Sequence, residues 1–219
     1  MSAEKNGDTD TLALLTLVLR GALYLLAAIA AVEFITSLAI FSMPARLKTP
    51  EAIAAGAGSS LNAVFDGAFR AELIVAGLTA ILFLAWVYLA KTGTLRLGAA
   101  GLRISPVWAV VWYLIPIANF WKPCQTMDET WQASANPANW QEQKVGTLGQ
   151  RWSFLWLAGV VAWLFLAREG GKQPSPEQTQ MLGVAMTISV AVHVVFYIVT
   201  ALVIQEIYKL QAEAWGRRK

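Results

Sequence analysis

Five long apolar runs, separated by polar connections, restrict the fold of this chain more than any other feature. They cover residues 12–43, 73–90, 107–121, 152–167 and 181–204. With 57% hydrophobic and 14% charged residues, a soluble domain of 219 residues could not bury so much apolar surface. Runs of this length are typical of helices that cross a bilayer. The sequence therefore predicts an all-α integral membrane helical bundle, with residues 1–219 as a single membrane domain.

Four of the runs are predicted to be spanning helices. The first, 12–43, continues for 32 residues and is much longer than the apolar core of a cleaved signal peptide, so it is interpreted as a retained helix. The second helix is expected at 73–90, and the last two are expected at 152–167 and 181–204. Tryptophans near the ends of these runs, including Trp86 and Trp152, are interpreted as anchors at the membrane interface.

The stretch 105–134 does not fit a straight spanning helix. Its apolar part has only 15 residues, and Pro116 removes a backbone hydrogen bond in its middle. Pro123 then suits the first turn of a new, amphipathic helix, in which Glu129 is predicted to lie on the polar side. We expect a broken Trp/Pro-rich element that is re-entrant or partly inserted.

The distribution of Lys and Arg slightly favours four spanning helices over the alternative of five. In the four-helix arrangement, the N-terminus, the region 91–151 and the C-terminus lie on one side of the membrane. That side carries most of the basic residues and is predicted to be the cytoplasm. Both termini are therefore expected to be cytoplasmic.

The stretch LRISPVWAVVWYLIPIANFWKPCQTMDETWQAS resembles the hallmark of a bacterial multi-pass membrane family, domain-of-unknown-function family 4328. The residues that carry the resemblance are Trp108, Trp112, Tyr113, Pro116, Asn119, Trp121, Pro123 and Trp131. The resemblance implies a helical bundle in the bacterial cell (inner) membrane and implies no known reaction. One departure is at Thr92 to Thr94, where such proteins often carry an Asn, and it weakens any role for that turn.

A few polar residues within the apolar runs are candidate functional or structural sites. Glu33 and His193 each lie near the middle of a predicted spanning helix, and we expect them to pair with one another. Tyr197 follows His193 on the same helix face, while Asn119 follows the Pro116 break. For His193 an interhelical hydrogen bond is preferred to a proton relay, and for the break a kink is preferred to a substrate cavity.

The sequence predicts no catalytic residue, cofactor or metal site. It has one cysteine and one histidine, which excludes a two-cysteine metal site and a zinc triad formed by this chain alone. The expected partners are the lipid bilayer and another membrane protein, and nucleic acid is not expected because no basic run is present. Anionic lipid could bind at Lys91, Arg96, Arg103 and Lys122.

Three functions are compatible with these patterns. The first is a non-catalytic membrane interaction or scaffold module whose distinctive surface is the central stretch. The second is a small transporter or channel-like module that uses the Pro116 break together with Glu33 and His193. The third is a membrane enzyme that acts on a lipid-like substrate, although no motif of a known hydrolase or nucleotide-binding enzyme is present.

Overall fold

The computed structural model describes residues 2–47, 49–169 and 176–217, and every regular element in these ranges is helical. The elements are α1 (Ser2–Phe41), η1 (Ala45–Leu47), α2 (Pro50–Ala54), α3 (Ser59–Arg96), α4 (Pro106–Leu114), η2 (Ala118–Phe120), α5 (Lys122–Ala135), η3 (Trp140–Glu142), α6 (Thr147–Glu169) and α7 (Pro176–Gly216). The predicted all-helical class is therefore confirmed. Much of the segment 44–72, which separates the first two predicted helices, is helical, since α3 begins at Ser59.

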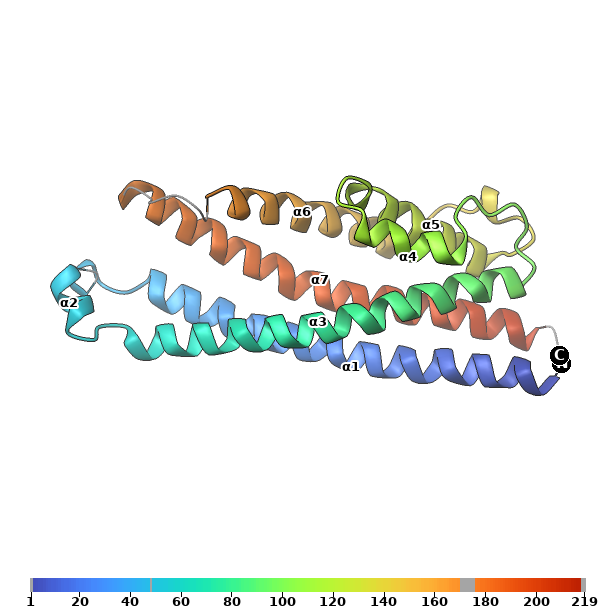
Figure 1. Cartoon of the computed structure of the whole chain (residues 1–219), viewed down its shortest axis with the longest axis horizontal. Coiled ribbons are helices and arrows are strands. Elements are labelled where there is room, and N and C mark those ends of the chain that lie inside the picture. The colour runs from blue at the N-terminus through green and yellow to red at the C-terminus, as the bar shows by residue number, and fades with distance from the viewer. Residues whose placement is uncertain (1, 48, 170–175, 218–219) are drawn as a thin grey trace.

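The long helices α1, α3 and α7 lie side by side and form the body of the molecule (Figure 1). Helix α7 contacts α1, α3, α5 and α6, so it joins the other two long helices to α5 and α6. The beginning of α1 and the end of α7 lie at the same end of the bundle, where α3 also ends (Figure 1). We call this end the α3 C-terminal end.

Three helices within the described residues are long and apolar enough to cross a membrane: Asp10–Phe41, Ser59–Arg96 and Met181–Gly216. Their outward faces carry large apolar side chains such as Leu17, Ile74 and Ile81, each about two-thirds exposed. A soluble helix would present polar residues there. These features are those of a membrane protein.

Within the described residues, three helices qualify as candidate spans by length and composition, one fewer than the four that were predicted. One of the four predicted spans, 152–167, lies within α6, which is not among the three. The side chains at 163 and 165–167 lie outside the described set. The alternative fifth span would need the central stretch, but α4 has only 9 residues and is about 14 Å long, against a hydrocarbon core of about 30 Å.

The central stretch folds into a helical hairpin, α4–η2–α5, whose two helices run antiparallel along α6 and the end of α3 (Figure 1). Ser105 caps α4, because its hydroxyl accepts a hydrogen bond from the Trp108 N–H at 3.4 Å. The helix ends at Leu114 because Ile115 precedes a proline and adopts an extended conformation. Residues 106–135 are called the hairpin below, and η2 is its tip.

Candidate functional site

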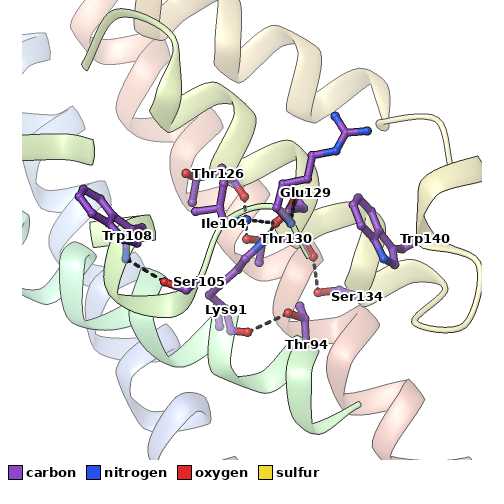
Figure 2. Close-up of polar contacts among 12 residues, drawn as sticks. Lys91, Thr94, Ile104, Ser105, Trp108, Thr126, Glu129, Thr130, Ser134 and Trp140 are labelled. Atoms are coloured by element: carbon purple, nitrogen blue, oxygen red, sulfur yellow. Dashed lines mark hydrogen bonds and ion pairs between the residues drawn. The ribbon is translucent and has the colours of Figure 1, made fainter. Parts of the chain in front are cut away.

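A buried ion pair attaches the hairpin to the bundle. The Lys91 ammonium on α3 is fully buried and donates to the Glu129 carboxylate on α5 (Figure 2). The same carboxylate accepts the backbone N–H groups of Arg103 and Ile104, at 3.0 and 3.2 Å. Glu129 therefore joins the end of α3, the segment that leads into α4, and α5. A buried carboxylate that accepts hydrogen bonds from three donors can stay charged without contact with water.

Two predictions about these residues are wrong. Glu129 does not lie on the polar outer side of its helix, because the buried face of α5 is itself rich in polar residues, including Thr126, Thr130 and Ser134. Lys91 is completely buried and paired, so its ammonium is not at a surface where a lipid headgroup could contact it. The reason is the same in both cases: the hairpin folds back and covers the end of α3.

Gln211 on α7 forms a second attachment beside the ion pair. It is fully buried, and its amide nitrogen donates to the backbone oxygen of Ala90 at 2.8 Å and to the Ser134 hydroxyl at 3.0 Å. It therefore connects α7 with both α3 and α5. Gly93 leaves room for it, because a methyl group at that position would collide with the Gln211 carboxamide.

Replacing Gly93 by alanine is expected to lower the free energy of unfolding by about 1–3 kcal/mol, because Gln211 must shift and lose its hydrogen bonds. Gly77 on the same helix is the matched control, since an added methyl group there meets no atom within 4 Å. Alanine at Gly77 is expected to stabilise the helix by about 0.5–1 kcal/mol. Denaturant unfolding in detergent measures both changes. Equal effects at the two glycines would contradict the assigned role of Gln211.

The tryptophans of the hairpin have different environments. Trp108 and Trp112 stack with ring centroids 4.7 Å apart, and the Lys122 ammonium lies 5.3 Å from the Trp112 ring. Trp108 and Trp121 are about half exposed. Trp131 packs against Gly146, while Pro123 is buried. The first half of the hairpin therefore presents an aromatic surface with a positive charge.

A cavity of about 470 Å³ lies between the hairpin tip, α6 and α7. It is lined mostly by apolar side chains, including Leu155, Trp156, Val160, Leu164, Val192 and Phe196. The structure also brings three residues singled out from the sequence, Pro116, Asn119 and His193, to its wall. The Trp156 ring N–H donates to the backbone oxygen of Asn119 at 2.9 Å and fixes the tip against α6. A smaller cavity of about 290 Å³ shares Trp156 and Phe196 with it.

The predicted pair of Glu33 with His193 is wrong. Glu33 is almost fully buried and instead lies beside Glu72 of α3. The Tyr197 hydroxyl donates to Glu72 at 2.6 Å, so this polar group joins α1, α3 and α7. His193 stacks on Tyr197 and has no hydrogen bond to any described residue. Glu72 was not predicted, because its position at the end of a polar connection resembled that of a surface residue.

Asp128 on α5 is a titratable side chain of the hairpin that burial affects. Its Oδ1 atom is buried and has no hydrogen-bond partner among the described residues. Burial disfavours the charged form and raises the pKa of the carboxyl from 3.8 to about 6. The folded protein therefore binds a proton there more tightly than the unfolded chain does.

It follows that the ionisation of Asp128 lowers the stability of the folded state as the pH rises from about 4 to 6. Above that range the loss of stability stays constant, and below pH 4 it is absent. Replacing Asp128 by asparagine is expected to stabilise the protein by about 1–2 kcal/mol near pH 8, a value reduced for partial exposure, and to give no gain below pH 4. Unfolding measured across this pH range tests the expectation. The exposed carboxylate variant Glu142→Gln serves as the control, and a gain for Asp128→Asn that is the same at every pH would contradict it.

These arrangements can hold an amphiphilic molecule, since an apolar cavity and a fixed hairpin are both present. Within the described residues, no group of three or more His, Cys, Asp or Glu side chains is arranged to hold a metal ion. The ion pair, Gln211 and Glu72 were missed from the sequence. Their partners are separated by 38 or more residues, and only the folded hairpin or bundle brings them together.

No curated protein and no solved structure matches the chain. A family model described as a domain of unknown function, DUF4328, matches residues 51–209, which include α3, the hairpin, α6 and most of α7. The match covers well over half of the sequence and agrees with the resemblance found in the central tryptophan and proline residues. The chain therefore belongs to the DUF4328 family.

Proposed function

We propose that this protein is a non-catalytic multi-pass module of the bacterial inner membrane that binds other membrane components through its hairpin. The observation that carries the proposal is the combination of a fixed base and an accessible tip. The base is attached through Lys91 and Glu129, whereas the tip lines an apolar cavity. A surface that is held in place before its ligand arrives loses less entropy on binding.

In the proposed topology, α6 is a fourth spanning helix and both termini are cytoplasmic. The support is that α1 begins and α7 ends at the α3 C-terminal end (Figure 1). The exposed basic residues Arg103 and Arg151 lie between α3 and α4 and near the start of α6. The base of the hairpin then lies on the cytoplasmic side. Arg96, Arg103 and Lys122 are the proposed contacts for anionic lipid, without Lys91.

Cysteine accessibility tests the topology. In a Cys124→Ala background, single cysteines at the exposed positions Ala55 and Ala138 lie on the two connections that should face opposite sides. We expect a membrane-impermeant reagent to label the Ala138 position only from the cytoplasm and the Ala55 position only from outside. Labelling of both positions from the same side would overturn the proposal.

Native mass spectrometry of the purified protein tests the binding role. We expect lipids or a partner protein to remain bound after extraction in mild detergent. A Glu129→Gln variant, in which the base of the hairpin is loosened, is expected to retain less of them than an Arg217→Gln control at an exposed surface pair. Equal retention by the two variants would show that the hairpin is not the binding element.

A small transporter is the second candidate function, and the buried group of Glu33, Glu72 and Tyr197 favours it. Acidic side chains within spanning helices commonly mark pathways for ions or protons. Reconstituted liposomes distinguish the two functions. Proton or cation flux above that of protein-free liposomes, removed by Glu33→Gln but not by Glu129→Gln, would replace the binding role with transport.

A further inference from the structure

The cavity at the hairpin tip has the size and lining of a ligand site. Its volume of about 470 Å³ falls in the range of roughly 300–1,000 Å³ found for small-molecule sites. Leu114 and Leu164, which line it, are also exposed on the outside of the protein. In a membrane these side chains contact lipid, so a molecule can enter the cavity directly from the bilayer.

Three polar side chains in the wall, those of Tyr113, Asn119 and His193, make no side-chain hydrogen bond to any described residue. The carboxamide of Asn119 makes no side-chain hydrogen bond to any described residue, and its Oδ1 atom is buried. The His193 ring, on the opposite helix, makes only the stacking contact with Tyr197 in the described part of the chain. An unpaired polar group in an apolar environment is costly, because no water is present to replace the missing partner.

The chemistry of Asn119 and His193 defines the polar end of a ligand. A carboxamide and a neutral imidazole each offer both a donor and an acceptor. Among the described side chains that line the cavity, none belongs to Lys, Arg, Asp or Glu. A charged headgroup would therefore be left without a counter-ion, whereas a hydroxyl group can donate to one side chain and accept from the other.

We infer that this cavity binds a membrane lipid with a long aliphatic chain and an uncharged hydroxyl head. The chain lies against Leu155, Val160 and Leu164, and the hydroxyl lies between Asn119 and His193. This inference rests on the proposed binding role of the hairpin and names its ligand class. A long-chain alcohol and a diacylglycerol share this chemistry, and separate probes distinguish them.

Photolabelling tests the location. The probe is hexadecanol with a diazirine in its chain, applied to the full-length protein in detergent or nanodiscs. We expect mass spectrometry to find labelled peptides from the cavity-lining parts of α6 and α7. Labelling spread over all lipid-exposed helices, with no preference for these peptides, would overturn the inference.

Gly159 offers a way to fill the cavity without disturbing the fold. It lines the cavity, and an added Cβ there meets no atom within 4 Å. Gly159→Leu should fold, because leucine is a stronger helix former than glycine, and it should lose most of the labelling. Gly77→Leu is the matched control, because Gly77 has the same open surroundings on α3 and lines neither cavity. Unchanged labelling in Gly159→Leu would overturn the inference.

Competition on the wild-type chain tests the head group without any substitution. Unlabelled hexadecanol should compete about tenfold better than its methyl ether, because the ether lacks the donor and leaves a polar group unpaired. An unlabelled diacylglycerol tests the second source of the same head group, and hexadecyl phosphate should compete poorly. Stronger competition by the phosphate would overturn the assignment of an uncharged head.

The variants Asn119→Leu and His193→Phe should abolish the preference for the alcohol over the ether while retaining labelling by the chain. A preference that persists in both variants would show that other groups bind the hydroxyl. If the cavity tests fail but lipids still co-purify in a manner that depends on Glu129, only this inference falls. If nothing co-purifies, the proposed function falls as well.

Discussion

Replacing Lys91 by methionine is expected to lower the free energy of unfolding by about 3–5 kcal/mol, since it leaves the Glu129 carboxylate buried without its counter-ion. Glu129→Gln should cost a similar amount, because it leaves the Lys91 ammonium buried instead. The double variant Lys91→Met/Glu129→Gln contains no buried charge at this place. The loss of stability in this double variant should be smaller than the sum of the losses in the two single variants by about 1–3 kcal/mol.

Denaturant unfolding in detergent, followed by tryptophan fluorescence, measures these differences. Glu213→Gln is the control, because it removes a pair with Arg217 that is about two-thirds exposed and 4.0 Å long, and it should change stability by less than about 1 kcal/mol. Strictly additive effects of the two buried substitutions would contradict the pairing.

Exchanging the two charges provides a sharper test. In Lys91→Glu/Glu129→Lys, opposite charges are still present, but a lysine side chain at position 129 cannot accept the N–H groups of Arg103 and Ile104. We expect this variant to be less stable than Lys91→Met/Glu129→Gln, in which the carboxamide oxygen introduced at position 129 can still accept. Full recovery of stability by the exchange would show that Glu129 acts only through its charge.

Truncation of Trp152 to alanine should produce an effect of similar size, about 3–5 kcal/mol, because the side chain is completely buried between α6 and α7. Its ring N–H donates to the Thr200 hydroxyl at 3.0 Å, and that hydroxyl donates in turn to the Phe196 carbonyl. Trp86 makes the same arrangement between α3 and α1, where it donates to Thr16 at 2.9 Å. Both tryptophans therefore connect two helices through a threonine.

The companion variant Thr200→Val keeps the volume and removes the acceptor, so its cost should be about 1–3 kcal/mol. Trp121→Ala is the control, because Trp121 is about half exposed, and it should cost much less than Trp152→Ala. The measurement is again unfolding in detergent. Similar losses for Trp121 and Trp152 would contradict the structural role assigned to Trp152.

These tryptophans also show where the sequence is ambiguous. The apolar runs correctly predicted a helical membrane protein, because length and hydropathy are properties of a segment alone. Trp86 and Trp152 were predicted to be interface anchors, but they are core residues. An indole has a large apolar surface and one donor, so it suits either environment. The decisive feature is a threonine on a neighbouring helix, which the sequence does not reveal.

The hairpin was predictable in part, because some of its features depend only on the local sequence. Pro116 and Pro123 end and begin helices by local stereochemistry, so the break could be read from the sequence. The polarity of α5 gave the wrong orientation for Glu129, because the face of the bundle that it covers contains Lys91 and Gln211. The cavity could not be predicted, since its wall comes from three segments, although Asn119 and His193 were each recognised as unusual.

The antiparallel course of α4 and α5 has a consequence for the biogenesis of the chain. Because the hairpin returns to the end of the bundle from which it departs, it adds nothing to the parity of membrane crossings, however deeply its tip inserts (Figure 1). In the proposed topology, the translocation machinery can therefore orient α6 and α7 relative to α1 and α3 whether or not this segment has yet folded. Insertion of the long helices and docking of the hairpin are therefore separable events, and docking can follow insertion.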